Sequence, residues 1–143
     1  MNKLAYIDDC QLDHFILKKI LSRFGSPYEV KCSSSGNSVL YLLSRYRMEK
    51  EKLPEMVMID IHSEEFDAWE FLAKMKALYP GLARQIEVYV LSASKYPEDI
   101  ERLKQYSFVK AFIVKPITRE VMLQLIQQKK EMPARLSILE SQN

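Results

Sequence analysis

The chain has 143 residues, which suits one domain, and a domain of this length can bury about two-thirds of the surface that its unfolded chain exposes. Its composition, 48% hydrophobic and 28% charged, is ordinary for a globular protein. The formal net charge of +2 provides no strong attraction to nucleic acid or to a membrane surface. No apolar run approaches the roughly 20 residues of a membrane span. We therefore expect neither a nucleic-acid-binding protein nor a membrane protein.

The cysteines and the N-terminus indicate a cytoplasmic protein. Cys10 and Cys32 lack CxxC spacing, so we expect reduced thiols and no disulfide. The first apolar run, at residues 4–7, is too short for the core of a signal peptide.

The first half of the chain predicts three strands and two helices. A strand at 3–7 leads to a helix whose apolar residues recur every four positions and which ends near Gly25, a natural C-cap. A strand at 28–32, a helix at 37–48 and a strand at 56–59 follow. The apolar residues expected to face the core from these two helices are Leu12, Ile16, Ile20, Phe24, Val39, Leu40, Leu43 and Tyr46.

The second half predicts three helices and two strands. Asp67 can cap a helix whose third residue is a glutamate, which completes a capping box, and Pro80 ends that helix. The remaining elements are a strand at 86–91, a helix from Pro97, a strand at 111–114 and a helix at 118–128. The segment after Pro133 is expected to be peripheral.

Strands that alternate with helices at this spacing indicate parallel pairing and right-handed crossovers. We therefore predict an α/β fold of the flavodoxin-like, doubly wound kind, with a five-stranded parallel sheet of order 2-1-3-4-5 flanked by five helices.

Polar side chains follow four of the five strands at the point where each strand ends. Asp8 and Asp9 follow the first strand, and Asp60 follows the third. Ser92 and Lys115 follow the fourth and the fifth. Each of these residues alone has an ordinary interpretation as a turn, cap, loop or surface residue. In a sheet of this order ligands bind outside the carboxyl ends of the strands, so the five residues together predict one site.

Three carboxylates in one site require a compensating cation. Two like charges 4 Å apart repel by about 4 kcal/mol at an effective dielectric near 20. Mg²⁺ suits a site of few carboxylates and several waters. With Mg²⁺ present, Asp60 can attack a phosphoryl group, since carboxylates form aspartyl phosphates. Lys115 would neutralise charge on the transferring oxygens, and Ser92 would donate a hydrogen bond to one of them.

The motifs that carry these residues resemble the receiver domain of two-component response regulators, over roughly residues 3 to 128. They are the acidic pair Asp8-Asp9, the triplet Met58-Ile59-Asp60, Ser92-Ala93 and Lys115-Pro116. The resemblance implies a receiver domain at 1–130 and a C-terminal tail at 131–143.

The resemblance also implies a role for each site residue. Asp60 would be the phosphoacceptor, and Lys115, before a cis proline, would pair with the phosphoryl group. The Mg²⁺ ligands would be Asp8, Asp9, Asp60 and the backbone carbonyl of His62. Ser92 and Phe112 would be the switch residues that respond to phosphorylation.

The function implied is that of a phosphorylation-gated switch without an output domain of its own. A histidine kinase or phosphotransfer protein would supply the phosphoryl group, and a downstream target protein would receive the signal. A weak homodimer is a further partner that the resemblance allows, whereas nucleic acid and membranes are not expected. Self-catalysed phosphoryl acceptance and autodephosphorylation do not turn over an outside substrate, so we do not expect an enzyme.

The loop after Asp60 departs from the family pattern. Ser63-Glu64 and Phe66-Asp67-Ala68 stand where the family often has Met-Pro and Met-Asp-Gly. Glu64 and Glu65 add negative charge near the site, which places its metal affinity in question. One alternative is therefore a receiver fold that binds a partner without phosphorylation. Another is an Asp-nucleophile phosphatase, although such enzymes commonly use two acids one residue apart on the first strand.

Four further residues have default structural interpretations. We expect the side chain of His62 to be a partly exposed loop residue rather than a metal ligand, because Mg²⁺ prefers oxygen. We expect His14 to be a surface histidine. Trp69 and Tyr79 are expected to pack around the third helix.

Overall fold

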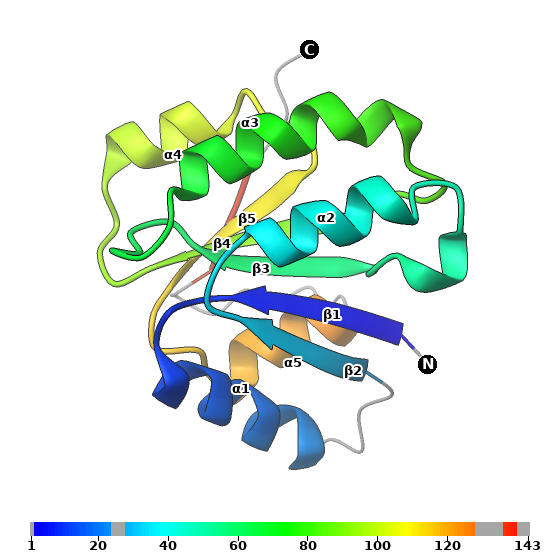
Figure 1. The fold of residues 1–143 in the computed structure, drawn as a ribbon. Helices are drawn as coiled ribbons and strands as arrows, with labels where there is room; N and C mark the ends of the chain where they lie inside the picture. The colour runs from blue at the N-terminus through cyan, green and yellow to red at the C-terminus, as the bar shows by residue number, and fades with distance from the viewer. Residues whose placement is uncertain (1, 24–27, 128–135, 140–143) are drawn as a thin grey trace.

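The computed structural model describes residues 2–23, 28–127 and 136–139. Helices cover both faces of a central sheet, with α2, α3 and α4 on one face and α1 and α5 on the other (Figure 1). The strands are β1 (Asn2–Ile7), β2 (Tyr28–Ser33), β3 (Met56–Asp60), β4 (Glu87–Ser92), β5 (Val109–Val114) and β6 (Leu136–Ile138). The helices are α1 (Gln11–Arg23), α2 (Asn37–Arg45), α3 (Ala68–Leu78), α4 (Pro97–Leu103) and α5 (Arg119–Gln127), with 3₁₀ turns η1 (Lys50–Lys52) and η2 (Tyr79–Gly81).

The order of the first five strands confirms the predicted fold. The sheet runs β2-β1-β3-β4-β5-β6, and every pair among the first five strands is parallel. The central strands are buried on both faces, which explains why β3 is an unbroken apolar run up to Asp60. Of the described helices, none has the length and apolar character needed to cross a bilayer.

The sixth strand corrects the prediction for the C-terminal segment. Leu136–Ile138 lies within the tail predicted at 131–143, yet it pairs antiparallel with β5 and widens the sheet, and Leu139 is buried directly after it. The physical reason is that β5 would otherwise present a row of unpaired backbone groups at the sheet edge. The rest of that tail and the predicted C-cap Gly25 lie outside the described residues.

Two apolar clusters form the core, one on each face of the sheet. The cluster below α2, α3 and α4 includes Ile7, Ile59 and Phe112. The cluster below α1 and α5 includes Tyr6 and Met58 from the alternate strand positions. Val121, Met122 and Leu125 of α5 are buried, as are Phe71, Leu72 and Met75 of α3, while Trp69 and Tyr79 pack at the edge of the first cluster.

The start of α3 confirms Asp67 as a helix cap. Its Oδ1 accepts a hydrogen bond from the backbone N–H of Glu70 at 3.1 Å. The Glu70 carboxylate forms an ion pair with Lys74 at 2.6 Å, one turn further along the helix.

The predicted apolar stripe of α1 is confirmed for Ile20, which packs against the core cluster on that face, and wrong for Leu12. Leu12 is 65% exposed, and the buried positions are His14, Leu17 and Leu21. A strict four-residue spacing advances about 40° around the helix at each step, so such a row drifts away from the core. Phe24, the last residue of the predicted stripe, lies outside the described residues.

The prediction of a surface His14 is also wrong. The residue is only 6% exposed, and its ring contacts that of Tyr6 edge-on at a centroid distance of 5.2 Å. The imidazole of His14 lies on the core-facing side of α1, where the four-residue spacing predicts aliphatic side chains.

Candidate functional site

The carboxyl ends of β1 and β3 bring three aspartates together. The strands pair in parallel with Ile7 opposite Ile59, so the residues that follow them emerge side by side. Carboxylate oxygens of Asp8, Asp9 and Asp60 all lie within 4.8 Å of one another. Asp8 and Asp60 are buried and Asp9 is half-buried. This confirms that the predicted acids converge at one edge of the sheet.

Lys115, which follows β5, reaches into this cluster. Its Nζ lies 2.8 Å from Oδ2 of Asp8, 2.9 Å from Oδ2 of Asp13 and 3.3 Å from Oδ2 of Asp60. Its side chain is 16% exposed. Burial acts to lower the pKa of Lys115, but its hydrogen bonds to Asp8 and Asp13, together with the charges of Asp60 and Asp8, outweigh this and raise the pKa above its usual value. The ammonium therefore stays charged and offsets the repulsion among the carboxylates.

Asp60 is held by groups on both of its oxygens. Oδ1 accepts a hydrogen bond from the backbone N–H of His62 at 3.1 Å, and Oδ2 faces Lys115. Burial raises the pKa of Asp60, and the charge of Asp8 adds to this, although the His62 N–H and Lys115 act in the opposite direction. A further cation in the cluster would favour the ionised carboxylate that nucleophilic attack requires.

Asp8 is anchored by two donors. The Tyr6 hydroxyl donates to Oδ2 at 2.7 Å, and the backbone N–H of Cys10 donates to Oδ1 at 2.9 Å. Burial and the bond to Asp8 raise the pKa of Tyr6, so its hydroxyl remains a donor. Cys10 and Cys32 are both free and half-buried.

Sequence reasoning missed two members of the site, Tyr6 and Asp13. Tyr6 stands two residues before Asp8, and this spacing places both side chains on one side of an extended strand. That signal is readable in the sequence. Asp13 lies in the first turn of α1, and its contact with Lys115 depends on how α1 packs on the sheet, so no local pattern indicates it.

The predicted switch residues are both buried. The Ser92 hydroxyl donates to the carbonyl of Ser94 at 2.7 Å and accepts from the N–H of Ser94 at 3.2 Å, so it is engaged in its own turn. Phe112 is fully buried in the cluster below α3 and α4. The Lys115-Pro116 peptide bond is cis, as the resemblance implied.

The ring of His62 lies apart from the acid cluster. Its Nε2 is 2.8 Å from Oδ2 of Asp99 in α4, and its ring contacts Tyr96 edge-on at 5.8 Å. The side chain is about half exposed, which confirms the predicted loop position. The metal-binding role of its carbonyl stays a prediction.

Solved structures match this arrangement of strands, whereas no protein-family model and no curated protein sequence matches the chain. A two-component response regulator from Legionella pneumophila aligns with a TM-score of 0.75 and 22% identity, over 90% of this chain and 97% of that one. The chemotaxis response regulator CheY4 of Vibrio cholerae aligns with a TM-score of 0.67 and 21% identity, over 90% and 98%. The signal receiver domain of an HD domain-containing protein from Pseudomonas fluorescens aligns with a TM-score of 0.70 and 17% identity, over 89% and 92%. The chain has the receiver-domain fold.

The donor set of this receiver fold suits a hard divalent cation. The cluster offers carboxylate oxygens from Asp8, Asp9 and Asp60, without sulfur or imidazole. Mg²⁺ prefers oxygen ligands and keeps several waters, so the half-buried position of Asp9 is compatible with a partly hydrated ion.

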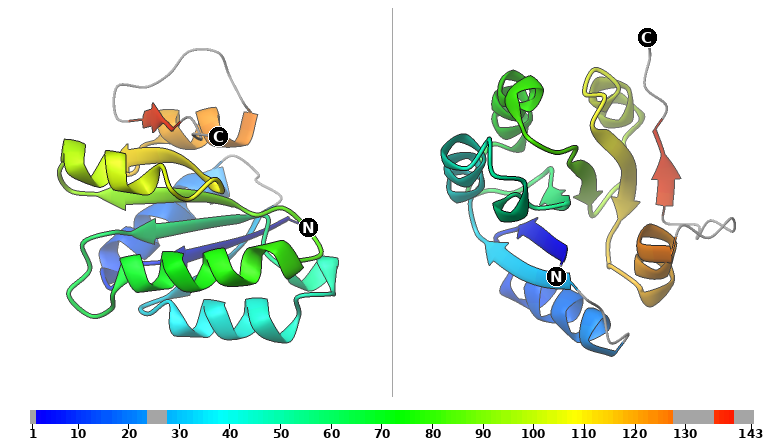
Figure 2. Two further views of the ribbon diagram at one scale, coloured as in Figure 1. Left: turned by 90° about the horizontal axis from the view of Figure 1, so that it is seen from above. Right: turned by 90° about the vertical axis from the view of Figure 1, so that its right-hand side faces the viewer.

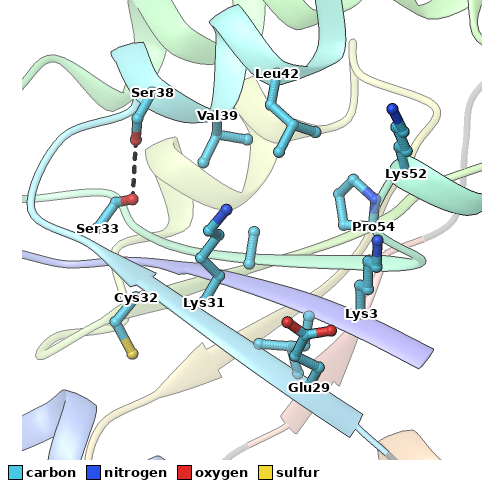
Figure 3. Close-up of a pocket in the computed structure, with 12 residues that line it drawn as sticks. Lys3, Glu29, Lys31, Cys32, Ser33, Ser38, Val39, Leu42, Lys52 and Pro54 are labelled. Carbon is cyan, nitrogen blue, oxygen red and sulfur yellow. Dashed lines mark hydrogen bonds between the residues drawn. The ribbon is translucent and has the colours of Figure 1, made fainter. Parts of the chain in front are cut away.

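A separate hollow of about 210 Å³ lies elsewhere on the receiver fold, between α2 and the strands β1 and β2 (Figure 3). Its apolar wall includes Val39 and Leu42, and Lys3, Lys31 and Lys52 stand around it. None of the acids of the cluster lines it. We therefore place the candidate functional site at the acid cluster and not at this hollow.

Proposed function

We propose that this protein is a response regulator that accepts a phosphoryl group on Asp60 and signals to a partner protein. The observation that carries the proposal is the cluster itself, in which the half-buried Lys115 lies within 3.3 Å of the buried Asp8 and Asp60 at the switch point of a doubly wound sheet. The donor would be a histidine kinase or phosphotransfer protein of a two-component phosphorelay.

The proposed transfer is a displacement at phosphorus. A carboxylate oxygen of Asp60 forms the new bond to phosphorus, and the bond from phosphorus to an imidazole nitrogen of the donor breaks. The imidazole leaves with that electron pair and takes up a proton from water. Lys115 would pair with a phosphoryl oxygen, because its ammonium already lies beside Oδ2 of Asp60.

The residues that would hold Mg²⁺ are Asp8, Asp9 and Asp60, with the carbonyl of His62. A bound Mg²⁺ would supply positive charge against the phosphoryl oxygens. The chain prepares this site with the Tyr6 and Cys10 donors, which hold the Asp8 carboxylate in place.

The proposed response involves Ser92 and Phe112. The Ser92 hydroxyl would exchange its bond to the Ser94 carbonyl for one to the phosphoryl group. Phe112 lies on β5, three residues before Lys115, so a shift of this strand would reach the surface formed by α4, β5 and α5. Such a local change of charge acting on a two-state element is a general route to signalling.

The decisive test is labelling by a phosphodonor in Mg²⁺. The wild-type chain is expected to take up one phosphoryl group, and Asp60→Asn is expected to take up none. Asp67→Asn is the matched control, because Asn also caps helices and Asp67 lies outside the cluster. Labelling of Asp60→Asn at the wild-type level would refute the proposal.

A second candidate is a receiver fold that binds its partner without phosphorylation. Two observations favour it: Lys115 already contacts both Asp8 and Asp13, and the Ser92 hydroxyl is already bonded to Ser94. Beryllofluoride, which mimics an acyl phosphate, distinguishes the candidates. Mg²⁺-dependent binding of beryllofluoride supports the phosphorylated switch, and failure to bind supports the constitutive module.

We also propose domain bounds, a location and a partner range for this protein. The receiver domain would span 1–130 with a tail at 131–143, and the protein would act in the cytoplasm. It would have no nucleic-acid or membrane partner and would catalyse only its own phosphorylation and dephosphorylation.

A further inference from the structure

The outer edge of β5 is covered by a segment from the same chain. β6 pairs antiparallel with it, matching Ala111 to Ile138, Phe112 to Ser137 and Ile113 to Leu136. The backbone N–H of Leu139 adds a hydrogen bond of 2.9 Å to the carbonyl of Lys110. Figure 2 shows β6 running along β5 on the side away from β4.

Leu139 anchors this segment in the core. It is 8% exposed and belongs to the same apolar cluster as Phe108 and Phe112. The strand therefore combines backbone pairing with one buried aliphatic side chain, which is the way extended peptides bind to sheet edges.

The pairing is short enough to be exchanged. β6 has three residues, whereas β5 has six, and Val109 and Val114 extend beyond the paired stretch. Exposed edge strands are templates for pairing with another chain. A partner strand that covers more of β5 can form more backbone hydrogen bonds than β6 does.

We propose that the β5 edge is a strand-docking site, that β6 occupies it as an autoinhibitory contact, and that a partner protein binds by placing an extended segment antiparallel to β5 with an aliphatic side chain where Leu139 lies. The partner must displace β6, which competes at an effective concentration on the order of millimolar because it is tethered. Because Phe112 lies on β5, this exchange takes place on the strand that leads to Lys115.

The test removes one backbone donor of β6. In an antiparallel pair, alternate residue pairs exchange hydrogen bonds, so Phe112 and Ser137 form the next bonded pair after Lys110 and Leu139. Ser137→Pro removes the backbone N–H of residue 137 in the full chain. Ser137→Ala keeps this N–H and is the matched control. The probe is a labelled synthetic peptide with the sequence of residues 134–142, used without phosphodonor.

The peptide is expected to bind Ser137→Pro at least tenfold more tightly than the wild-type or Ser137→Ala chain. Amide hydrogen exchange of β5 should rise in Ser137→Pro and fall again when the peptide is added. A peptide with proline in place of the serine should not bind. Equal binding to the three chains, or no binding to a folded Ser137→Pro chain, overturns the proposal.

Leu139→Ala is a second variant for the case in which Ser137→Pro does not fold. It weakens the anchor without touching the backbone, so the peptide should bind it more tightly than it binds the wild-type chain. If the peptide binds Leu139→Ala no more tightly than it binds the wild-type chain, the proposal is again overturned. Neither experiment involves Asp60 or Mg²⁺, so its failure leaves the proposed phosphorylation standing.

Discussion

Lys115→Met isolates the contribution of the only cation that the described residues place in the acid cluster. The substitution keeps an unbranched side chain but removes the ammonium, which lies within 3.3 Å of Asp8, Asp13 and Asp60. Asp8 is completely buried, so its charge would lose its nearest compensation without access to bulk water.

The expected loss of stability is about 3 kcal/mol. Breaking a buried ion pair by removing one partner destabilises by roughly 3–5 kcal/mol, whereas an exposed pair contributes about 0–1 kcal/mol. Lys115 is 16% exposed, which places the expectation at the low end of the buried range. At about 3 °C per kcal/mol for a chain of this size, the melting temperature should fall by about 10 °C.

Urea unfolding in EDTA and in Mg²⁺ measures this effect. In EDTA the variant should lose about 3 kcal/mol of unfolding free energy. Mg²⁺ should stabilise the variant more than the wild type, because the ion replaces the missing positive charge. Lys104→Met, which removes a partly exposed lysine paired with Glu101, should change stability by less than about 1 kcal/mol. A loss for Lys115→Met no larger than that of Lys104→Met would refute the reasoning.

Three further predictions concern the same cluster. Folding raises the pKa of Lys115, so the stabilisation that Lys115 gives to the protein should be full below about pH 10, the pKa of a lysine in the unfolded chain. The difference in unfolding free energy between wild type and Lys115→Met should shrink as the pH rises beyond that value. Because burial raises the pKa of Asp60, Asp60→Asn should be more stable than wild type in EDTA at about pH 7. This gain should shrink in urea titrations as the pH falls and vanish well below about 4, where the carboxyl is protonated in both the folded and the unfolded state. Tyr6→Phe should lose about 1.5–3 kcal/mol through its bond to Asp8, while Tyr41→Phe at an exposed tyrosine should stay within about 0.5 kcal/mol on urea unfolding.

The fold and most of the site were predictable because their signals are local. Asp8 and Asp60 each follow an apolar run directly, and a parallel sheet brings such positions to one edge whatever the details of packing. The cap at Asp67 is likewise a short-range pattern of side chain and backbone.

The features that the sequence did not reveal depend on packing between distant segments. The contact of Asp13 with Lys115 spans 102 positions and requires α1 to be docked on the sheet. The burial of His14 depends on how α1 is rotated about its own axis. Apolar residues occur on more than one side of this helix, so the sequence pattern does not determine that rotation. β6 forms because β5 leaves an edge open, and a three-residue strand has too little pattern of its own to be recognised.

The measurement that tests the central claim most directly is the intact mass of the chain after incubation with acetyl phosphate. We expect a gain of one phosphoryl group in Mg²⁺, located on the peptide that contains Asp60, and no gain in EDTA. An unchanged mass in Mg²⁺, with the chain folded, would contradict the account of Asp60 as a metal-dependent phosphoacceptor.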